Sequence, residues 1–259
     1  MISESNKKQV LSTKYLVGSS LLTGISIILT RFFSVIVPLV GLPALRIGFG
    51  SIPIMISGIL FGPIAGGLTG IVADLLGVII NPQGAFFPGF TLSAALTGII
   101  PGVLVKMFEN RLFRRFKFTI INGLTISTFI IMVFGILLSN GILKFNNSII
   151  LFYDNIVSNK LFFLVILLVL TMVILPFFIS KRNKLDYSKE GYPLDKIIFI
   201  QSLTYIIVSL GLNTFWLAMM FNKGYMIFLP GRILAGLIVI PLHSTIIYTI
   251  SKFFKYIKD

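Results

Sequence analysis

The sequence predicts an all-α fold, a polytopic bundle of helices that cross a membrane. Hydrophobic residues make up 56% of the 259 residues, and the mean hydropathy is +1.00, a composition that a water-soluble surface does not tolerate. The apolar residues also gather in runs of about 20, the length that crosses a hydrocarbon core about 30 Å thick. We therefore expect a single integral membrane domain over residues 1–259.

Eight hydrophobic runs predict about eight transmembrane helices. They cover Lys14–Ser34, Arg46–Phe61, Ile64–Ile80, Gly89–Phe108, Phe118–Leu138, Lys160–Ser180, Lys196–Phe221 and Ile227–Phe254. No small-residue cleavage site follows the first run, so we expect a retained helix there and not a signal peptide. The second and third runs are separated only by Gly62-Pro63, where glycine can end one helix and proline can begin the next.

Small residues recur at every fourth position in the early helices. They are Gly58, Gly62, Gly66 and Gly70, followed by Gly98 and Gly102. Glycine at this spacing lets two helix backbones approach closely within a membrane bundle. The second, third and fourth predicted helices should therefore form a compact core.

The basic residues encode the orientation of the chain. The net charge of +14 could suggest nucleic-acid binding, but the lysines and arginines lie in short loops between apolar runs. With the amino terminus in the cytoplasm, most of the 22 lysines and arginines fall on the cytoplasmic side, as the positive-inside rule requires. We expect both termini to be cytoplasmic and no nucleic-acid partner.

Arginines and aromatic residues converge on the predicted external face. Arg46 opens the second run, Phe87 and Phe90 lie in and beside the loop before the fourth helix, and Arg232 follows Pro230-Gly231. Aromatic rings stack on flat heteroaromatic molecules, and guanidinium groups bind carboxylates through paired hydrogen bonds. The set suits a flat ligand that carries carboxylates. The alternative is an interfacial aromatic belt with anchoring arginines.

Three further residues lie within the predicted spans. Asp74 is a carboxylate in lipid, which costs about 2.5–3.5 kcal/mol on insertion scales and should face the bundle interior. It could accept hydrogen bonds from ring nitrogens, or it could make a packing contact with a neighbouring helix. Asn213 and Trp216 lie in the outer part of the seventh run, where the tryptophan could be either a stacking plate or a membrane anchor.

The composition disfavours catalysis. The chain has no cysteine, one histidine and eight acidic residues, most of them in termini or loops, so that no carboxylate pair is placed for acid–base work. We expect His243 to be a hydrogen-bonded packing residue, with no metal site and no cofactor. A Walker-type phosphate loop is also missing, so we expect no enzyme activity, and active transport would draw its energy from partner proteins.

Several motifs, in order and spacing, resemble the folate-specific S components of energy-coupling factor (ECF) transporters. They are Leu45-Arg46-Ile47-Gly48-Phe49-Gly50, Phe61-Gly62-Pro63, Ala73-Asp74-Leu75-Leu76-Gly77, Phe87-Pro88-Gly89-Phe90-Thr91-Leu92-Ser93-Ala94, Gly211-Leu212-Asn213-Thr214-Phe215-Trp216-Leu217 and Pro230-Gly231-Arg232. The resemblance covers 14–108 and 196–254. It implies a six-helix vitamin-binding subunit of an ABC importer in the bacterial cell membrane. Such a subunit captures its ligand from outside and docks on one transmembrane coupling protein and two ATPases.

The resemblance also implies roles for single residues. Asp74 and Asn213 would lie near the hydrogen-bonding edge of a pterin, with Phe87, Phe90 and Trp216 in the stacking wall. At least one of Arg46 and Arg232 would pair with a carboxylate of the glutamate tail. The family's docking pattern would fall on the first helix at Ser20 and Gly24, beside Ser19 and Thr23.

Residues 112–195 depart from the family pattern, because about two additional helices lie where the family passes directly from its fourth to its fifth helix. Because two extra spans are an even number, the later helices cross the membrane in the same direction as in the family. Three alternatives to a folate S component are a subunit for another vitamin, an autonomous secondary transporter and a membrane enzyme. Few intramembrane acids and no visible inverted repeat disfavour the transporter, and the lack of a catalytic cluster disfavours the enzyme.

Overall fold

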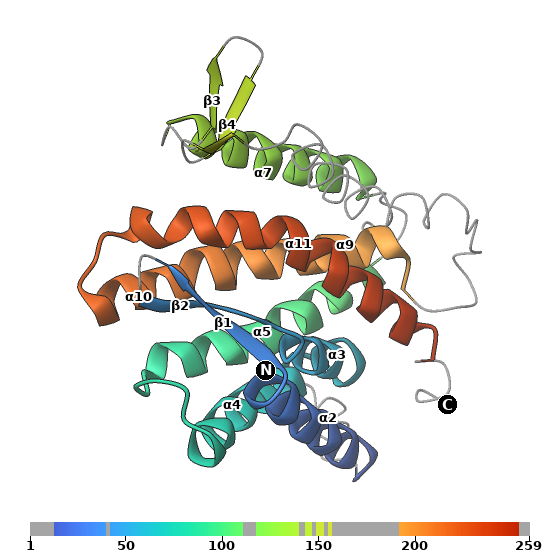
Figure 1. The fold of residues 1–259 in the computed structure, drawn as a ribbon. Coiled ribbons are helices and arrows are strands. Elements are labelled where there is room, and N and C mark those ends of the chain that lie inside the picture. The colour runs from blue at the N-terminus through green and yellow to red at the C-terminus, as the bar shows by residue number, and fades with distance from the viewer. Residues whose placement is uncertain are drawn as a thin grey trace.

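The described part of the chain forms a layered helical bundle with a two-stranded and a three-stranded antiparallel sheet inserted between helices (Figure 1). The structure, a computed structural model, describes residues 13–39, 42–110, 118–139, 143–146, 149–152, 155–156 and 192–253. The helices are α2 (Thr13–Arg31), α3 (Ser51–Phe61), α4 (Pro63–Ile80), α5 (Pro88–Glu109), α7 (Thr119–Ser139), α9 (Leu194–Thr204), the π-helix η1 (Tyr205–Asn213), α10 (Thr214–Phe221) and α11 (Tyr225–Ser251). The strands are β1 (Ser34–Leu39), β2 (Leu42–Gly48), β3 (Leu143–Asn146), β4 (Ile149–Phe152) and β5 (Asn155–Ile156).

The helices lie in successive layers. Helix α2 packs on α3 and α4, and these two helices pack on each other and on α5. Helix α5 in turn contacts α9, and α3 contacts α11. Helix α7 lies along the far side of α9 and α11 (Figure 1). Within the described residues, five helices are long and apolar enough to cross a membrane, with α9, η1 and α10 forming one of them. These five spans support a multi-pass membrane protein. Helix α3 and the part of α7 over Thr119–Met132 are also apolar, but they are shorter than the five spans.

Most predicted helices agree with the structure to within a few residues. The exception is the segment between the first two helices. Helix α2 ends at Arg31, near its predicted end at Ser34, but α3 begins only at Ser51 and not at Arg46. Arg46 was expected at the start of a helix, and that expectation is wrong, since it lies in β2. The predicted run Lys160–Ser180 and most of the predicted insertion lie outside the described residues.

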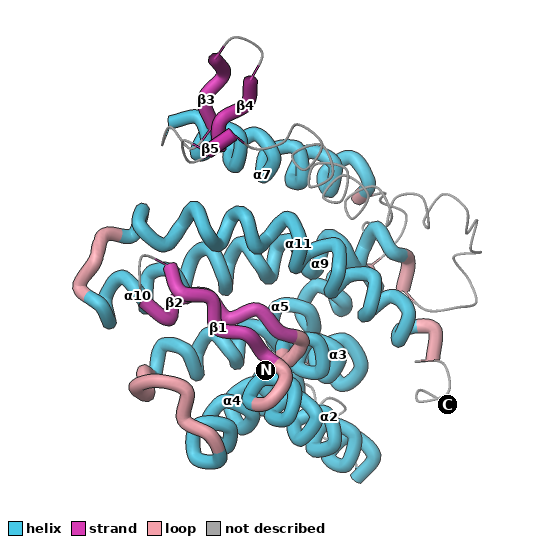
Figure 2. Tube along the Cα trace, viewed as in Figure 1, coloured by secondary structure: helices cyan, strands magenta, loops and turns pink. Residues whose placement is uncertain are grey.

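The segment between α2 and α3 forms the antiparallel hairpin β1–β2 (Figure 2). Val35 pairs with Ile47, Ile36 with Arg46 and Val37 with Leu45. Val35, Ile36, Val37 and Ile47 are β-branched and fit a pleated strand, but an apolar run of this length suits a helix equally well by composition. The sequence therefore predicts apolar character correctly here but not the type of element.

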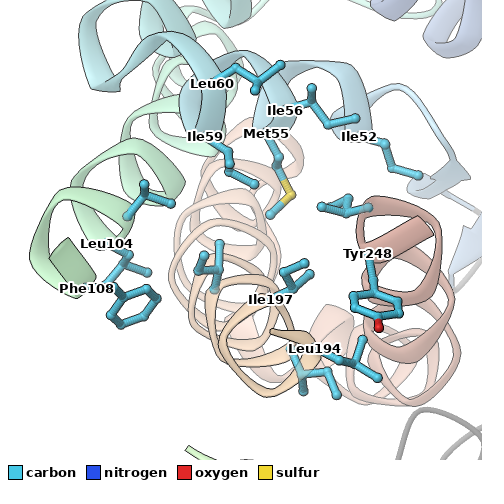
Figure 3. Packing of buried hydrophobic residues seen from close by; sticks show 14 of the residues in the cluster. Ile52, Met55, Ile56, Ile59, Leu60, Leu104, Phe108, Leu194, Ile197 and Tyr248 are labelled. Atoms are coloured by element: carbon cyan, nitrogen blue, oxygen red, sulfur yellow. The ribbon is translucent and has the colours of Figure 1, made fainter. Parts of the chain in front are cut away.

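Glycines bring α3, α4 and α5 into backbone contact, as their spacing predicts. A Cβ atom on Gly66 would lie 2.6 Å from the Cα atom of Gly58, and one on Gly102 would lie 2.5 Å from the nitrogen of Pro63. No side chain fits at such separations. The main hydrophobic cluster lies next to these contacts, where Met55, Leu104 and Ile197 of three different helices point toward one another (Figure 3).

Candidate functional site

A cavity of about 150 Å³ lies between the β1–β2 hairpin and the second half of the bundle. Strand β2, the start of α3, one turn of α5, the α9–η1 segment and α11 form its walls. The lining residues are Leu45, Arg46, Ile47, Gly48, Ser51, Met55, Thr97, Gln201, Thr204, Tyr205, Val208, Ser209, Asn213, Ala235, Val239 and His243. About half of the lining residues carry polar side chains, more than the few polar groups of a typical small-molecule site.

The π-helix η1 supplies one wall of this cavity. In a π-helix the hydrogen bonds join residues five apart, a rare geometry that is frequently found at functional sites. The carbonyl of Ser209 in η1 accepts additional hydrogen bonds from the Thr214 hydroxyl and from Nη1 of Arg232, each at 3.1 Å. The Arg232 guanidinium thus stabilises the altered backbone that lines the cavity.

Two amide oxygens at the cavity have unused hydrogen-bonding capacity. Gln201 is only 3% exposed, and neither its Oε1 nor Oδ1 of Asn213 has a hydrogen-bond partner among the described residues. A buried polar atom without a partner costs about 1–3 kcal/mol. A ligand that offers N–H groups at these two positions would recover that cost.

His243 contributes a third polar group to the same wall. Its Nδ1 atom lies 3.4 Å from Oγ of Ser51 and 3.5 Å from Nε2 of Gln201, distances at the long end for hydrogen bonds. The ring also lies 5.9 Å from the ring of Phe49. His243 therefore packs within the bundle as expected and also lies in the cavity wall, a position that the sequence did not indicate.

Arg46 lies on β2 and lines the cavity with a solvent-accessible side chain. Desolvation by the surrounding protein lowers the pKa of Arg46 from its ordinary value, the positive charge of Arg31 lowers it further, and Asp74 raises it. Arginine starts so far above neutral pH that the guanidinium stays cationic. The hairpin therefore places one permanent positive charge at the cavity.

Asp74 takes part in a polar cluster of its own. One carboxylate oxygen lies 3.4 Å from Nη2 of Arg31, and the other accepts a hydrogen bond of 2.8 Å from Thr91. The Arg31 carbonyl accepts hydrogen bonds from the side-chain amides of Asn81 and Gln83. These contacts join α2, α4 and α5 to the loop between the last two, and Asp74 is not among the residues that line the cavity.

Phe87, Phe90 and Trp216 form an aromatic cluster between the beginning of α5 and α10. The ring of Phe87 lies 6.0 Å from that of Phe90 and 5.8 Å from that of Trp216. The indole nitrogen of Trp216 donates to the hydroxyl of Ser93 at 3.2 Å. The three predicted aromatic residues are thus together, but they lie outside the cavity lining.

Ser20 and Gly24 lie on a face of α2 that the rest of the bundle leaves open. The Ser20 side chain is exposed, and a Cβ atom on Gly24 would meet no atom within 4 Å. Thr23, by contrast, is buried and hydrogen-bonds the carbonyl of Ser19. A large side chain at either of the two positions would therefore not collide with the described part of the protein.

The structure brings two of the seven predicted ligand residues, Arg46 and Asn213, into one cavity. Arg232 is buried behind the η1 wall, where Nη1 also donates to the Ser209 hydroxyl at 3.2 Å. Sequence reasoning missed Thr97, Gln201, Tyr205 and Ser209. Gln201 could have been found, because an amide in the middle of an apolar membrane helix is costly unless it faces a polar partner or a cavity.

Residues 14–180 match the family described as "ECF transporter, substrate-specific component". Over 79 residues the chain is 48% identical to a "Folate transporter FolT" of Clostridium novyi (strain NT), which is 30% of this chain and 43% of that protein. Over 155 residues it is 33% identical to an "Uncharacterized protein MG098 homolog" of Mycoplasma pneumoniae, which is 52% of this chain and 32% of that one. The chain thus spans less than half the length of either relative.

A solved structure described as "Crystal structure of FolT bound with folic acid" has the same fold. The similarity covers 93% of both chains with a TM-score of 0.54 and 18% sequence identity. At this identity the likeness concerns the arrangement of the elements and not the ligand-binding residues.

Proposed function

This chain belongs to the family of substrate-specific components of ECF transporters, and on that premise we propose that it binds a folate in the cavity beside the β1–β2 hairpin. Partner subunits, one transmembrane coupling protein and two ATPases, then drive its uptake. Family membership supports a transport subunit and not an enzyme. Both termini lie in the cytoplasm in this proposal, so that the hairpin and the cavity are on the external side.

The observation that carries the proposal is the presence of unpartnered buried amide oxygens, on Gln201 and Asn213, in the wall of one cavity. A pterin presents an exocyclic amino group and a ring N–H along one edge, both of them donors, and we assign the Asn213 oxygen to that edge. Gln201 lies twelve residues earlier in the same continuous helix, on the order of 15 Å away along its axis, and would accept from another part of the ligand. An apolar ligand would leave both oxygens unpaired at a cost of about 1–3 kcal/mol each.

The size of the cavity favours binding of one ring system inside it. Sites that enclose a drug-sized molecule measure about 300–1,000 Å³, and this cavity measures about 150 Å³. The pterin would fill it, while the aromatic linker and the glutamate would extend along β2. There the Arg46 guanidinium would pair with a glutamate carboxylate through charge-assisted hydrogen bonds.

Contacts of the ligand with Asp74, Phe87, Phe90, Trp216 and Arg232 stay predictions. These residues lie outside the described cavity, with Asp74 engaged by Arg31 and Thr91. Docking at Ser20 and Gly24 is proposed on the open face of α2, where small residues permit close approach of a partner helix.

The test is to purify the protein, identify any small molecule that stays bound by mass spectrometry, and titrate the ligand-free protein with folic acid and with a pterin that lacks the tail. Arg46→Ala should weaken folic-acid binding about tenfold, the worth of one charge-assisted contact, and leave pterin binding nearly unchanged. Lys106→Ala removes an exposed charge at the far end of α5 and serves as the matched control.

Equal losses for both ligands in Arg46→Ala would refute the tail assignment. A different vitamin retained through purification would refute folate while leaving the family role intact. Uptake of folic acid by this chain alone in energised vesicles, without ATPases, would refute dependence on partners.

A further inference from the structure

Helix α7, which follows the four-helix segment α2–α5, is fixed to the bundle by a buried polar contact. Asn122 is fully buried and donates from Nδ2 to the carbonyl of Asp195 at 2.7 Å. The backbone nitrogen of Phe118 donates to Oδ2 of Asp195 at 3.2 Å. Hydrogen bonds that close buried polar groups between helices resist separation in lipid, so α7 has a defined place beside α9.

About two turns farther along, α7 reaches the wall of the ligand cavity through Phe129. Its ring is buried and lies 6.4 Å from the ring of Tyr205. Gly236 of α11 makes room for both rings, since a Cβ atom there would lie 2.7 Å from Cε1 of Phe129 and 2.8 Å from Cε1 of Tyr205. Phe129 and Tyr205 thus fill a gap that an ordinary residue in α11 would close.

Tyr205 connects this contact to the ligand. It is the first residue of η1 and lines the cavity, and its hydroxyl donates to the carbonyl of Arg232 at 2.6 Å. Arg232 in turn holds the carbonyl of Ser209 in the same π-helix. A shift of the Tyr205 ring toward α7 would therefore strain the contacts that keep η1 in its π geometry.

We propose that Phe129 is a positioning residue of the ligand site, through which α7 holds Tyr205 and the π-helical wall in the binding geometry. The identity of the ligand rests on the proposed function, but the effect on η1 does not. Helix α7 lies within residues 112–195, for which the sequence predicts about two helices beyond the six-helix family pattern. In this proposal it contributes to binding and is more than a lipid-facing addition.

The experiment compares Phe129→Ala, Phe129→Leu and the control Ile131→Ala in detergent or nanodiscs. Ile131 is on the same helix and 70% exposed, so its truncation removes little contact with the described part of the bundle. Two quantities are measured: amide hydrogen exchange of the peptide that covers Tyr205–Asn213, without ligand, and the dissociation constant for folic acid. Phe129→Ala should speed the exchange about tenfold or more and weaken folic-acid binding about tenfold.

Phe129→Leu refills most of the volume and should return both quantities toward the parent values, while Ile131→Ala should change neither. Unchanged exchange in folded Phe129→Ala would overturn the proposal whatever the ligand is. Faster exchange with unaltered folic-acid affinity would overturn the link to the site. If Phe129→Ala does not fold, Phe129→Val, which leaves part of the gap open, decides by the same two measurements, and parent values for both would overturn the proposal. If the parent protein fails to bind folic acid, the proposed function fails, and the exchange data alone decide the role of Phe129.

Discussion

Helices α3, α4 and α5 meet through their backbones, whereas α9, η1 and α11 meet through side chains. In the first region, Gly58, Gly66 and Gly98 have no side chains, so that the backbones of the helices are in direct contact. In the second, Tyr205, Arg232 and Ser209 are linked by hydrogen bonds around a cavity. Close backbone packing leaves few alternative arrangements, while a wall of side chains can present polar groups to a ligand. The first region provides a rigid support, and the second region lines the cavity in which we propose that the ligand binds.

The largest effect should follow from a bulky residue in the glycine contact. In Gly98→Leu the new side chain would overlap the backbone carbonyl of Gly66, and we expect a stability loss of about 3 kcal/mol or more. Thermal unfolding of the purified protein measures it. Gly123→Leu on α7 is the control, because a Cβ atom there meets nothing within 4 Å. Equal stability of the two variants would mean that the backbone contact is not what holds this region.

Asp74→Ala should produce the next largest effect, on stability more than on binding. It leaves the buried Arg31 guanidinium without its carboxylate partner, which costs on the order of 3 kcal/mol for a buried pair. The measurements are the melting temperature and the folic-acid affinity of the folded fraction. Thr91→Val removes only the second contact of the carboxylate and should cost less. Normal stability with lost affinity would instead favour the predicted ligand contact of Asp74.

In the region that lines the cavity, Asn213→Leu should weaken ligand binding without unfolding the protein. Leucine has a similar volume but no acceptor, so a donor on the ligand is left unpaired, which corresponds to roughly a 10- to 100-fold loss of affinity. Isothermal titration with folic acid and with pterin measures it, and both ligands should be affected equally. Asn110→Leu, at the exposed C-terminal end of α5 and outside the cavity, is the comparison. A loss for folic acid alone would place Asn213 beside the tail instead of the ring.

The smallest effect on stability and binding is expected for Ser20→Trp combined with Gly24→Trp. Both positions face away from the described bundle, so that ligand affinity and melting temperature should be unchanged. Co-purification of the coupling subunits and uptake should be lost, because bulky residues prevent close approach of a partner helix. Retention of both would move the docking surface elsewhere on the protein.

The sequence alone determined the features that depend on local composition and spacing. Apolar runs located the helices α4, α5, α7 and α11 to within a few residues, since the length needed to cross lipid is fixed by the membrane. The four-residue glycine spacing predicted the contact among α3, α4 and α5, because residues four apart lie on one helix face. The family motifs identified the kind of protein before the fold was known.

Only the tertiary structure decided which polar residues share a cavity. Arg46 and Asn213 are far apart in sequence and line one cavity because β2 contacts α11, which packs beside η1. Asp74 and Arg232 instead bind partners of their own. The hairpin itself escaped prediction, because a short apolar run fits a strand or a helix equally well by composition. The sequence did not predict the π-helix either. Its hydrogen bonds between residues five apart are supported by partners such as Arg232, which belongs to a helix that follows later in the chain.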